Sequence, residues 1–82
     1  MGAKTDGREL VDGDRQADYG PPEENMRRIG LAWSAILDTP VGPEQVALCM
    51  AALKLVREAH RHKSDNIVDA HGYIEIVDRI AR

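Results

Sequence analysis

The distribution of large apolar side chains is the feature that most limits the fold of this chain. Of 24 such residues (Leu, Ile, Val, Met, Tyr and Trp), 20 follow position 21. From Pro21 onward they recur at intervals of three and four residues, which is typical of amphipathic helices. No segment alternates apolar and polar residues for long enough between turn signals to predict a strand. An all-α fold is therefore expected.

Breakers and start signals divide this region into three helices. The first is expected over about 22–37, with a proline in its first turn and acidic residues next to its positive end. Two prolines and a glycine within 38–43 end it, and the second helix runs over about 43–60. After a basic link, Ser64 or Asp65 is positioned to cap a third helix that reaches about Ile80. Short connections predict a small antiparallel helical bundle.

The inward-facing positions of these helices follow from the helical period. The second helix is apolar on more than one face, which indicates contact with two neighbours or with a second chain. A chain of 82 residues buries little surface, so a homodimer is expected to complete the fold. The expected inward positions are Met26, Ile29, Trp33, Ile36 and Leu37 on the first helix, Val46, Met50, Leu53 and Val56 with Leu48, Leu55 and Ala59 on the second, and Ile67, Ala70, Ile74 and Val77 with Tyr73, Ile76 and Ile80 on the third.

The first 20 residues differ in composition from the rest. They hold eight charged residues and only four large apolar ones, too few to offset the entropy of ordering such a segment. We expect a flexible tail over 1–20, with one weak helical turn around 8–11, followed by a single helical domain over 21–82.

Composition excludes several classes of protein. Eleven basic against 14 acidic residues give a net charge of −3, which argues against general DNA binding. No apolar stretch approaches the ~20 residues that span a bilayer, so we expect a cytoplasmic protein without a membrane partner. The single cysteine, Cys49, allows neither an internal disulfide nor a cysteine-based zinc site. Its neighbours Leu48 and Met50 predict a buried thiol.

Several polar residues occupy positions that the helical period points inward. Asn66, Asp69 and Tyr73 share one face of the third helix, and Asp65 lies one turn before Asp69. Carboxylates one turn apart that face another helix form an oxygen-rich pocket suited to Mg²⁺ and to nucleotide phosphates. Each residue also has a simpler explanation, since Asp65 can be a helix cap and Asp69 can pair with Arg57 or Lys54.

Two segments of the sequence resemble a group of small phage and prophage proteins. They are Gly13-Asp-Arg-Gln-Ala-Asp-Tyr-Gly-Pro-Pro-Glu-Glu-Asn25, and Lys54-x-x-Arg57-Glu-Ala-His followed by Asp65-Asn-x-x-Asp69-x-x-Gly72-Tyr73. That group in turn resembles the MazG-like, all-α nucleoside triphosphate pyrophosphohydrolases. The resemblance covers about residues 9–78. It implies a nucleotide-binding protein, and with it an Mg²⁺-dependent cleavage of a triphosphate into a monophosphate and pyrophosphate.

The enzyme superfamily holds Mg²⁺ with an E-x-x-E pair on one helix and an E-x-x-D pair on a later one. Asp69 matches the final Asp, but its partner position is Asn66, and the arginines at 27 and 28 leave no E-x-x-E after Glu24. Glu75-x-x-Asp78 fits E-x-x-D literally but lies beyond the motif that ends at Tyr73, and on an outer face of the helix. The resemblance implies Asp69 and Glu58 as catalytic residues, Glu24, Asp65 and Asp69 as metal ligands, and Asn25, Lys54, Arg57, Asn66 and Tyr73 as phosphate or nucleotide contacts.

A second hypothesis from the same residues is a non-catalytic helical dimerisation or interaction module of phage or prophage origin. Under it, the polar residues only satisfy one another at a junction between helices. A dimer is compatible with both hypotheses, because the broad apolar surfaces of the second and third helices can meet those of a symmetry mate.

Overall fold

The computed structural model describes residues 20–82, which form three helices and contain no strand: α3 (Pro22–Leu37), α4 (Pro43–His60) and α5 (Ser64–Ala81). The all-α prediction is confirmed, and the helix bounds agree with those expected from the prolines and the basic link. The predicted flexible tail, including its helical turn, lies outside the described residues except for Gly20. No helix within residues 20–82 combines the length and the apolarity that crossing a membrane requires.

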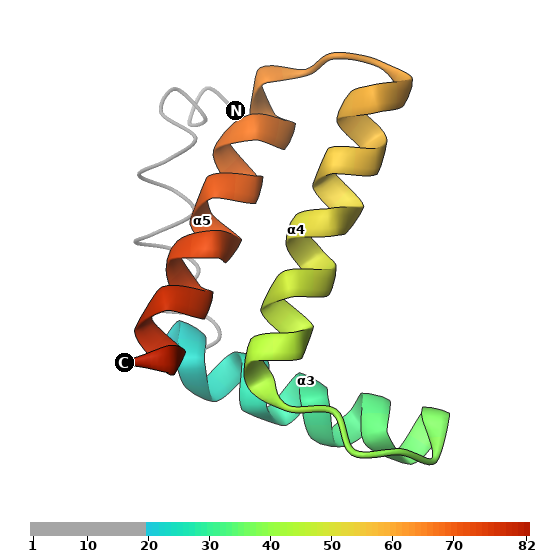
Figure 1. Ribbon diagram of the computed structural model, residues 1–82, viewed down its shortest axis with the longest axis vertical. Coiled ribbons are helices and arrows are strands. Elements are labelled where there is room, and N and C mark those ends of the chain that lie inside the picture. Colours follow the sequence, from blue (N-terminus) through green and yellow to red (C-terminus); the bar gives the residue numbers. More distant parts are fainter. Residues whose placement is uncertain (1–19) are drawn as a thin grey trace.

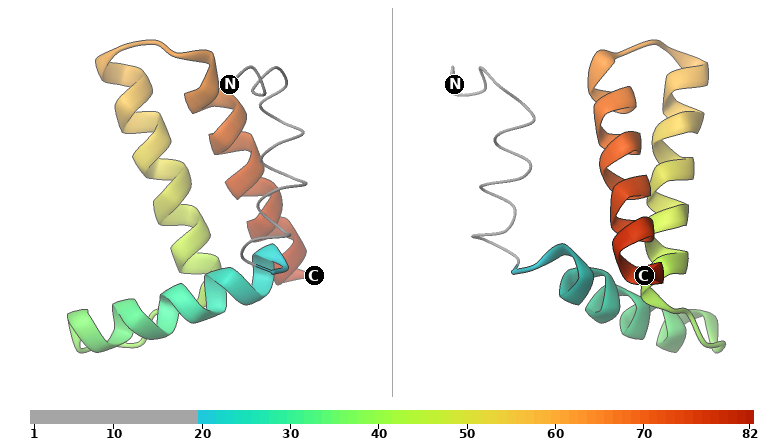
Figure 2. Two further views of the ribbon diagram at one scale, coloured as in Figure 1. Left: turned by 180° about the vertical axis from the view of Figure 1, so that it is seen from behind. Right: turned by 60° about the vertical axis from the view of Figure 1, so that its left-hand side comes forward.

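The three helices are not arranged as a simple bundle. Figures 1 and 2 show α4 and α5 side by side and running in opposite directions, while α3 lies across the end where α4 begins and α5 finishes. The contact between α4 and α5 is the most extensive in the structure, and α3 packs more on α4 than on α5. The expected antiparallel arrangement therefore describes the α4–α5 pair but does not extend to α3.

Local chemistry sets where the first two helices begin and end. Pro22 and Pro43 occupy first-turn positions, where their fixed φ suits a helix and no amide hydrogen is needed. The side-chain oxygen of Gln45 accepts the backbone N–H of Gly42 at 2.7 Å, which satisfies a donor at the start of α4. Asp38 ends α3 in the left-handed conformation, with φ 56° and ψ 42°.

The start of α5 differs from the prediction. Neither Ser64 nor Asp65 caps the helix, because the cap position is Lys63 and no side-chain cap is formed there. The backbone carbonyl of Lys63 accepts the N–H of Asn66 at 2.9 Å. The backbone N–H of Lys63 donates a hydrogen bond to Glu58 Oε1, also at 2.9 Å. A residue of α4 therefore holds the backbone in place at the residue that precedes α5.

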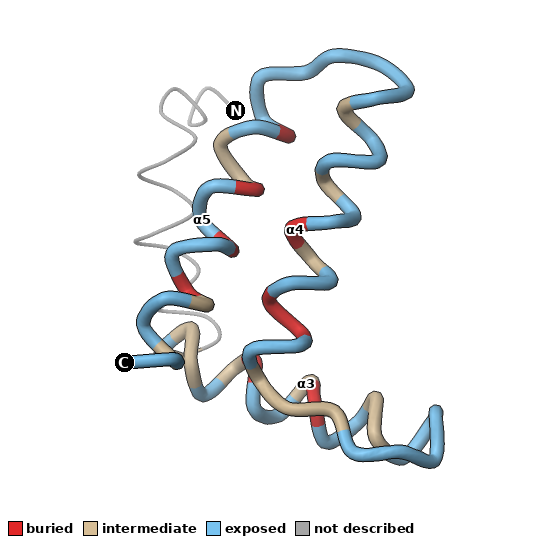
Figure 3. Tube along the Cα trace, in the orientation of Figure 1, coloured by how far each residue is buried: buried red, intermediate tan, exposed pale blue. Residues whose placement is uncertain are grey.

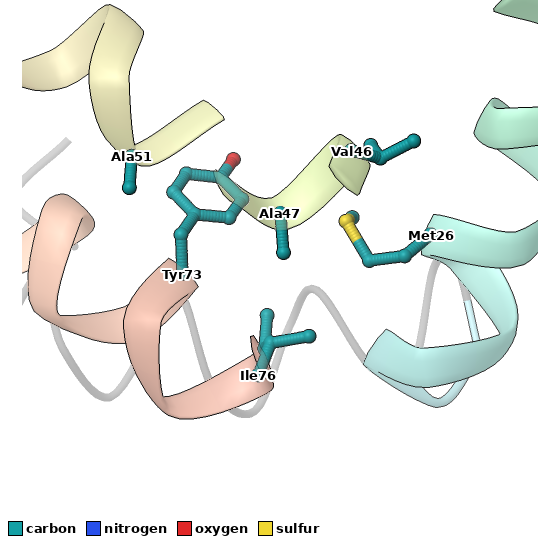
Figure 4. Close-up of a cluster of buried hydrophobic side chains, with 6 residues drawn as sticks. All are labelled: Met26, Val46, Ala47, Ala51, Tyr73 and Ile76. Atoms are coloured by element: carbon teal, nitrogen blue, oxygen red, sulfur yellow. The ribbon is translucent and has the colours of Figure 1, made fainter. Parts of the chain in front are cut away.

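The core is small and lies where the three helices meet (Figure 4). Alanines at two of the buried positions of α4 leave room for the aromatic ring of Tyr73 from α5. Among the described residues, Val46 is the largest side chain that is fully buried. The buried cluster consists of Met26, Val46, Ala47, Ala51, Tyr73 and Ile76.

A close backbone approach fixes α3 against the start of α4. Gly30 is buried, and a β-carbon at this position would lie 2.7 Å from the carbonyl oxygen of Val41. Ser34 reinforces the joint, because its hydroxyl donates to the carbonyl of Gly30 at 2.7 Å and accepts the N–H of Val41 at 2.8 Å. Only a glycine at position 30 fits this joint without moving the backbone.

Many positions that the helical period points inward are exposed (Figure 3). Ile36 and Leu37 are 77% and 60% exposed, because α3 crosses the pair and its last turn extends beyond α4 and α5. The predicted burial of Cys49 is wrong, since its thiol is exposed on α4. The other predicted inward positions that are exposed are Leu48, Leu53, Leu55, Val56, Ala59, Ile67 and Ile74.

Candidate functional site

Four polar side chains meet between the last turns of α4 and the first turns of α5, and we call them the polar junction: Lys54, Glu58, Asn66 and Asp69. The ammonium of Lys54 lies 2.9 Å from Oδ2 of Asp69, and the two side chains keep only 18% and 20% of their surface exposed. Solvent screens such a half-buried pair less than it screens a surface pair. The junction therefore includes an ion pair between facing helices.

Glu58 collects the other contacts of the polar junction. Its carboxylate accepts hydrogen bonds from His62 Nδ1, from the backbone N–H of Lys63 at 2.9 Å, and from Asn66 Nδ2 at 3.4 Å. The hydrogen bond from His62 lowers the pKa of Glu58 most, and the bonds from Lys63 and Asn66 lower it further. These donors hold Glu58 as a carboxylate at neutral pH.

The remaining predicted site residues near this end of the molecule divide into buried and exposed ones. Asn66 is buried, and Tyr73 is buried one turn beyond Asp69, in the core next to the junction. Asp65 and Arg57 are exposed. Together with Arg61 and Lys63, which are also exposed, Arg57 forms a basic edge beside the polar junction.

The structure does not bring the α3 residues to this site. Glu24 pairs with Arg27, with a carboxylate-to-guanidinium distance of 2.6 Å. Glu24 lines a shallow surface hollow with Ile80, which lies eleven residues beyond Asp69, or about 16 Å along α5. Asn25 follows Glu24 on α3 and is only partly buried. The structure therefore does not bring Glu24 and Asn25 together with Asp69, because α3 crosses the opposite end of the helix pair.

A complete metal cage is not formed by the described residues. Between residues 20 and 82, no group of three or more His, Cys, Asp or Glu side chains is placed to hold a metal ion. Mg²⁺ nevertheless often uses one or two carboxylates and completes its shell with water and substrate phosphate oxygens. Glu58 and Asp69 supply donors of that kind from facing helices. These donors fit a metal that arrives with a nucleotide, and they do not fit a resident ion held by protein alone.

One contact of the polar junction cannot be predicted from the sequence pattern. The bond from Lys63 to Glu58 joins residues five apart across a non-helical link, so no helical spacing rule predicts it. Likewise, the role of His62 as a donor to Glu58 follows only from the conformation of the link. Within residues 20–82, every buried side-chain nitrogen or oxygen has a hydrogen-bond partner.

Comparison with known proteins gives phage relatives. A family model described as a domain of unknown function, DUF6378, matches residues 5–81. The Gene 55 protein of Mycobacterium phage L5 is 33% identical over 82 residues, which cover 98% of this chain and 53% of the relative. The Gene 55 protein of Mycobacterium phage D29 is 33% identical over 72 residues, covering 87% and 48%. The chain thus spans about half the length of these relatives. No solved structure matches it.

Proposed function

The chain belongs to the DUF6378 family, and from its polar junction we propose that it is a MazG-like nucleotide-binding module of phage origin. The observation that carries the proposal is the convergence of Lys54, Glu58 and Asp69 at one place between α4 and α5. A small core gains little from half-buried ionisable groups, because their desolvation opposes folding. Partly buried clusters of ionisable groups are a common feature of ligand-binding sites.

The chemistry of the junction suits a nucleotide phosphate accompanied by Mg²⁺. Asp69 and Glu58 supply oxygen ligands. The ammonium group of Lys54, which pairs with Asp69, can pair with a phosphate oxygen instead. The exposed Arg57, at the basic edge, adds a second donor for phosphate. When bound, Mg²⁺ supplies charge neutralisation and polarises the phosphorus centre. A protein that binds such a ligand is expected in the cytoplasm.

Nucleotide binding is tested by titrating the protein with a nucleoside triphosphate and Mg²⁺ while amide NMR spectra are recorded. We expect shifts concentrated in residues 54–73 and absent from the first turn of α3. Asp69→Asn should weaken binding about tenfold or more, which corresponds to the loss of one charge-assisted contact. Asp78→Asn is the matched control, since Asp78 lies on the same helix, is exposed and pairs with Arg82. Absence of shifts at millimolar nucleotide would refute the proposal.

Catalysis requires its own measurement, because the junction has fewer acidic ligands than the enzymes it resembles. Pyrophosphate release should be followed over a panel of canonical and modified nucleoside triphosphates. Release by the wild-type protein that is lost in Asp69→Asn and kept in Asp78→Asn would establish a pyrophosphohydrolase. Binding without release would leave a nucleotide-binding protein that does not hydrolyse its ligand.

A second candidate is a non-catalytic helical dimerisation or interaction module. The specific observation in its favour is the exposure of nine large hydrophobic side chains within residues 20–82, against seven buried hydrophobic residues. Monomeric proteins rarely leave so much apolar surface uncovered. The two candidates are separated by the nucleotide titration, because an interaction module leaves the spectra of residues 54–73 unchanged.

A further inference from the structure

Four of the exposed hydrophobic residues lie in two regular stripes. Leu48 and Leu55 are seven residues apart on α4, and Ile67 and Ile74 are seven apart on α5. Seven residues make almost two helical turns, so each pair lies on one side of its helix. The four side chains are 51%, 52%, 39% and 52% exposed, respectively.

Both stripes lie on the same face of the α4–α5 pair. Leu48 directly follows the buried Ala47, and Ile67 and Ile74 directly follow the buried Asn66 and Tyr73. Each stripe is thus rotated about 100° in the same sense from a buried position. Because the two helices run in opposite directions (Figure 1), this common rotation brings the stripes to one side of the pair.

The register of the two helices brings the stripes level. Lys54 meets Asp69, and Glu58 meets Asn66, so positions further along α5 lie opposite earlier positions of α4. The same register places Leu55 near the level of Ile67, and Leu48 near the level of Ile74. We call the surface formed by Leu48, Leu55, Ile67 and Ile74 the open face.

The α3 helix does not cover the open face. Its Met26 packs with Val46 and Ile76 in the core. Val46 and Ile76 lie on the other side of the buried stripes, since Val46 directly precedes the buried Ala47, and Ile76 directly precedes Val77, which is partly buried against the core. α3 thus packs on one face of the helix pair, at the end where α4 begins, and the open face lies on the opposite side.

We infer that the open face is where two copies of this chain pair, each placing its α4–α5 pair against that of the other. The four side chains expose on the order of 350 Å² per copy, and the helix backbone and neighbouring small residues add to this area. A standard interface buries about 800 Å² per partner, of which roughly 60% is apolar. The open face therefore supplies most of the apolar surface that a modest dimer needs.

The chemistry of the face suits a second copy. In a twofold dimer each residue meets the same patch of its partner, so a patch with charged members repels itself. The four residues of the open face are uncharged, and the pairing places eight large aliphatic side chains between the two copies. On the same side of α5, His71 lies between Ile67 and Ile74, and Asp78, which pairs with Arg82, lies one turn beyond Ile74 at the edge of the face. This four-helix arrangement goes beyond the proposed nucleotide binding and does not depend on it.

Residues 1–19 are a poorer candidate for the occupant. Their sequence holds eight charged residues, and its large apolar side chains are Met1, Leu10, Val11 and Tyr19. A segment that fills a two-helix surface needs apolar anchors repeated at i, i+3 or i+4 and i+7. Such a repeat is absent from this sequence, whereas a second copy of the open face supplies four matching aliphatic side chains.

Sedimentation equilibrium of the full chain, wild type and variants, tests the inference. We expect a wild-type dimer, and an increase of about 100-fold or more in the dissociation constant of Ile74→Glu, because a charge then replaces a buried isoleucine in both copies. Ile36→Glu is the matched control, since Ile36 is 77% exposed on α3, away from the open face, and should pair as the wild type does. A wild-type monomer at high micromolar concentration, or an Ile74→Glu dimer of unchanged affinity, would overturn the inference.

A measurement on the wild type covers the case in which Ile74→Glu does not fold. A soluble paramagnetic agent broadens methyl signals that are open to solvent. As the protein concentration is raised, the methyl signals of the open face should become less broadened, because the second copy covers them. The methyl signals of Ile36 should stay broadened. Protection of the methyls of these four residues in a monomer would show that another part of the chain covers the face, and would exclude the second copy. Nucleotide binding, measured separately, can succeed or fail without affecting either result.

Discussion

The ammonium of Lys54 and the carboxylate of Asp69 lie 2.9 Å apart across the contact between α4 and α5, with about four-fifths of each side chain removed from water. A pair in this setting costs desolvation energy that its attraction must offset. Removing one partner leaves the other charge half-buried and unpaired, which is worse than removing both.

Single and double substitutions of this pair should therefore not add. Lys54→Met alone is expected to lower the free energy of unfolding by about 1–3 kcal/mol, because Asp69 loses its partner. The double variant Lys54→Met/Asp69→Leu should return to within about 1 kcal/mol of the wild type. Urea denaturation of the four proteins in the cycle measures these differences. Additive losses in the double variant would show that the pair contributes little beyond its individual side chains.

Glu58 should make stability depend on acid pH. Its pKa is lowered in the folded protein, first by the hydrogen bond from His62, so the folded state favours the carboxylate. This contribution is complete above the pKa of an unfolded glutamic acid, about 4.3, and is lost as the pH falls through the lower folded-state value.

Thermal denaturation of Glu58→Gln between pH 2.5 and 7 checks this dependence. The variant should be less stable than the wild type at pH 7, and the difference should shrink as the pH falls below about 4.3. Asp78→Asn, which removes an exposed acid of α5, is the control. A constant difference over the whole range would contradict the assignment.

Two glycines offer a matched pair of substitutions with opposite expected signs. Gly30→Ala should lower the free energy of unfolding by about 1–3 kcal/mol, because its β-carbon would meet the Val41 carbonyl at 2.7 Å. Gly72→Ala should raise it by about 0.5–1 kcal/mol, since nothing lies within 4 Å of the added carbon and alanine favours helix. Equal effects of the two in chemical denaturation would argue against the close joint between α3 and α4.

The end of α3 provides a test of backbone conformation. Asp38 has φ 56°, which a residue with a side chain adopts at a cost and which glycine adopts freely. Asp38→Gly should raise the free energy of unfolding by about 0.5–1 kcal/mol. Asp38→Ala removes the same charge without that freedom and should not stabilise the protein. Stabilisation by both variants would assign the effect to the charge.

The sequence predicted the helices better than their arrangement. The prolines at 22 and 43 and the basic link mark local events, so the bounds of α3, α4 and α5 follow from them. The crossing of α3 depends on Gly30 approaching the backbone at Val41, a contact that no periodicity reveals. For this reason Ile36 and Leu37 were expected inside and are exposed.

The candidate site was predicted in part for the same reason. Asp69 with Lys54, and Asn66 near Glu58, follow once α4 and α5 run in opposite directions across a short link. For Glu24 and Asn25 to reach the polar junction, α3 would have to lie along the α4–α5 pair. It lies across the opposite end of the pair instead (Figure 1). Helical spacing identifies the residues on one face of a helix, whereas contacts between helices also depend on their crossing angle.

The position of α3 at one end has a consequence for local unfolding. α4 and α5 contact each other along their length, whereas α3 is held mainly through Met26 and the Gly30–Ser34 joint to Val41. Regions held by few contacts open at lower free energy than the rest of a protein. Amide exchange should thus divide the described chain into two cooperative units, with α3 opening first. The polar junction belongs wholly to the unit that remains closed.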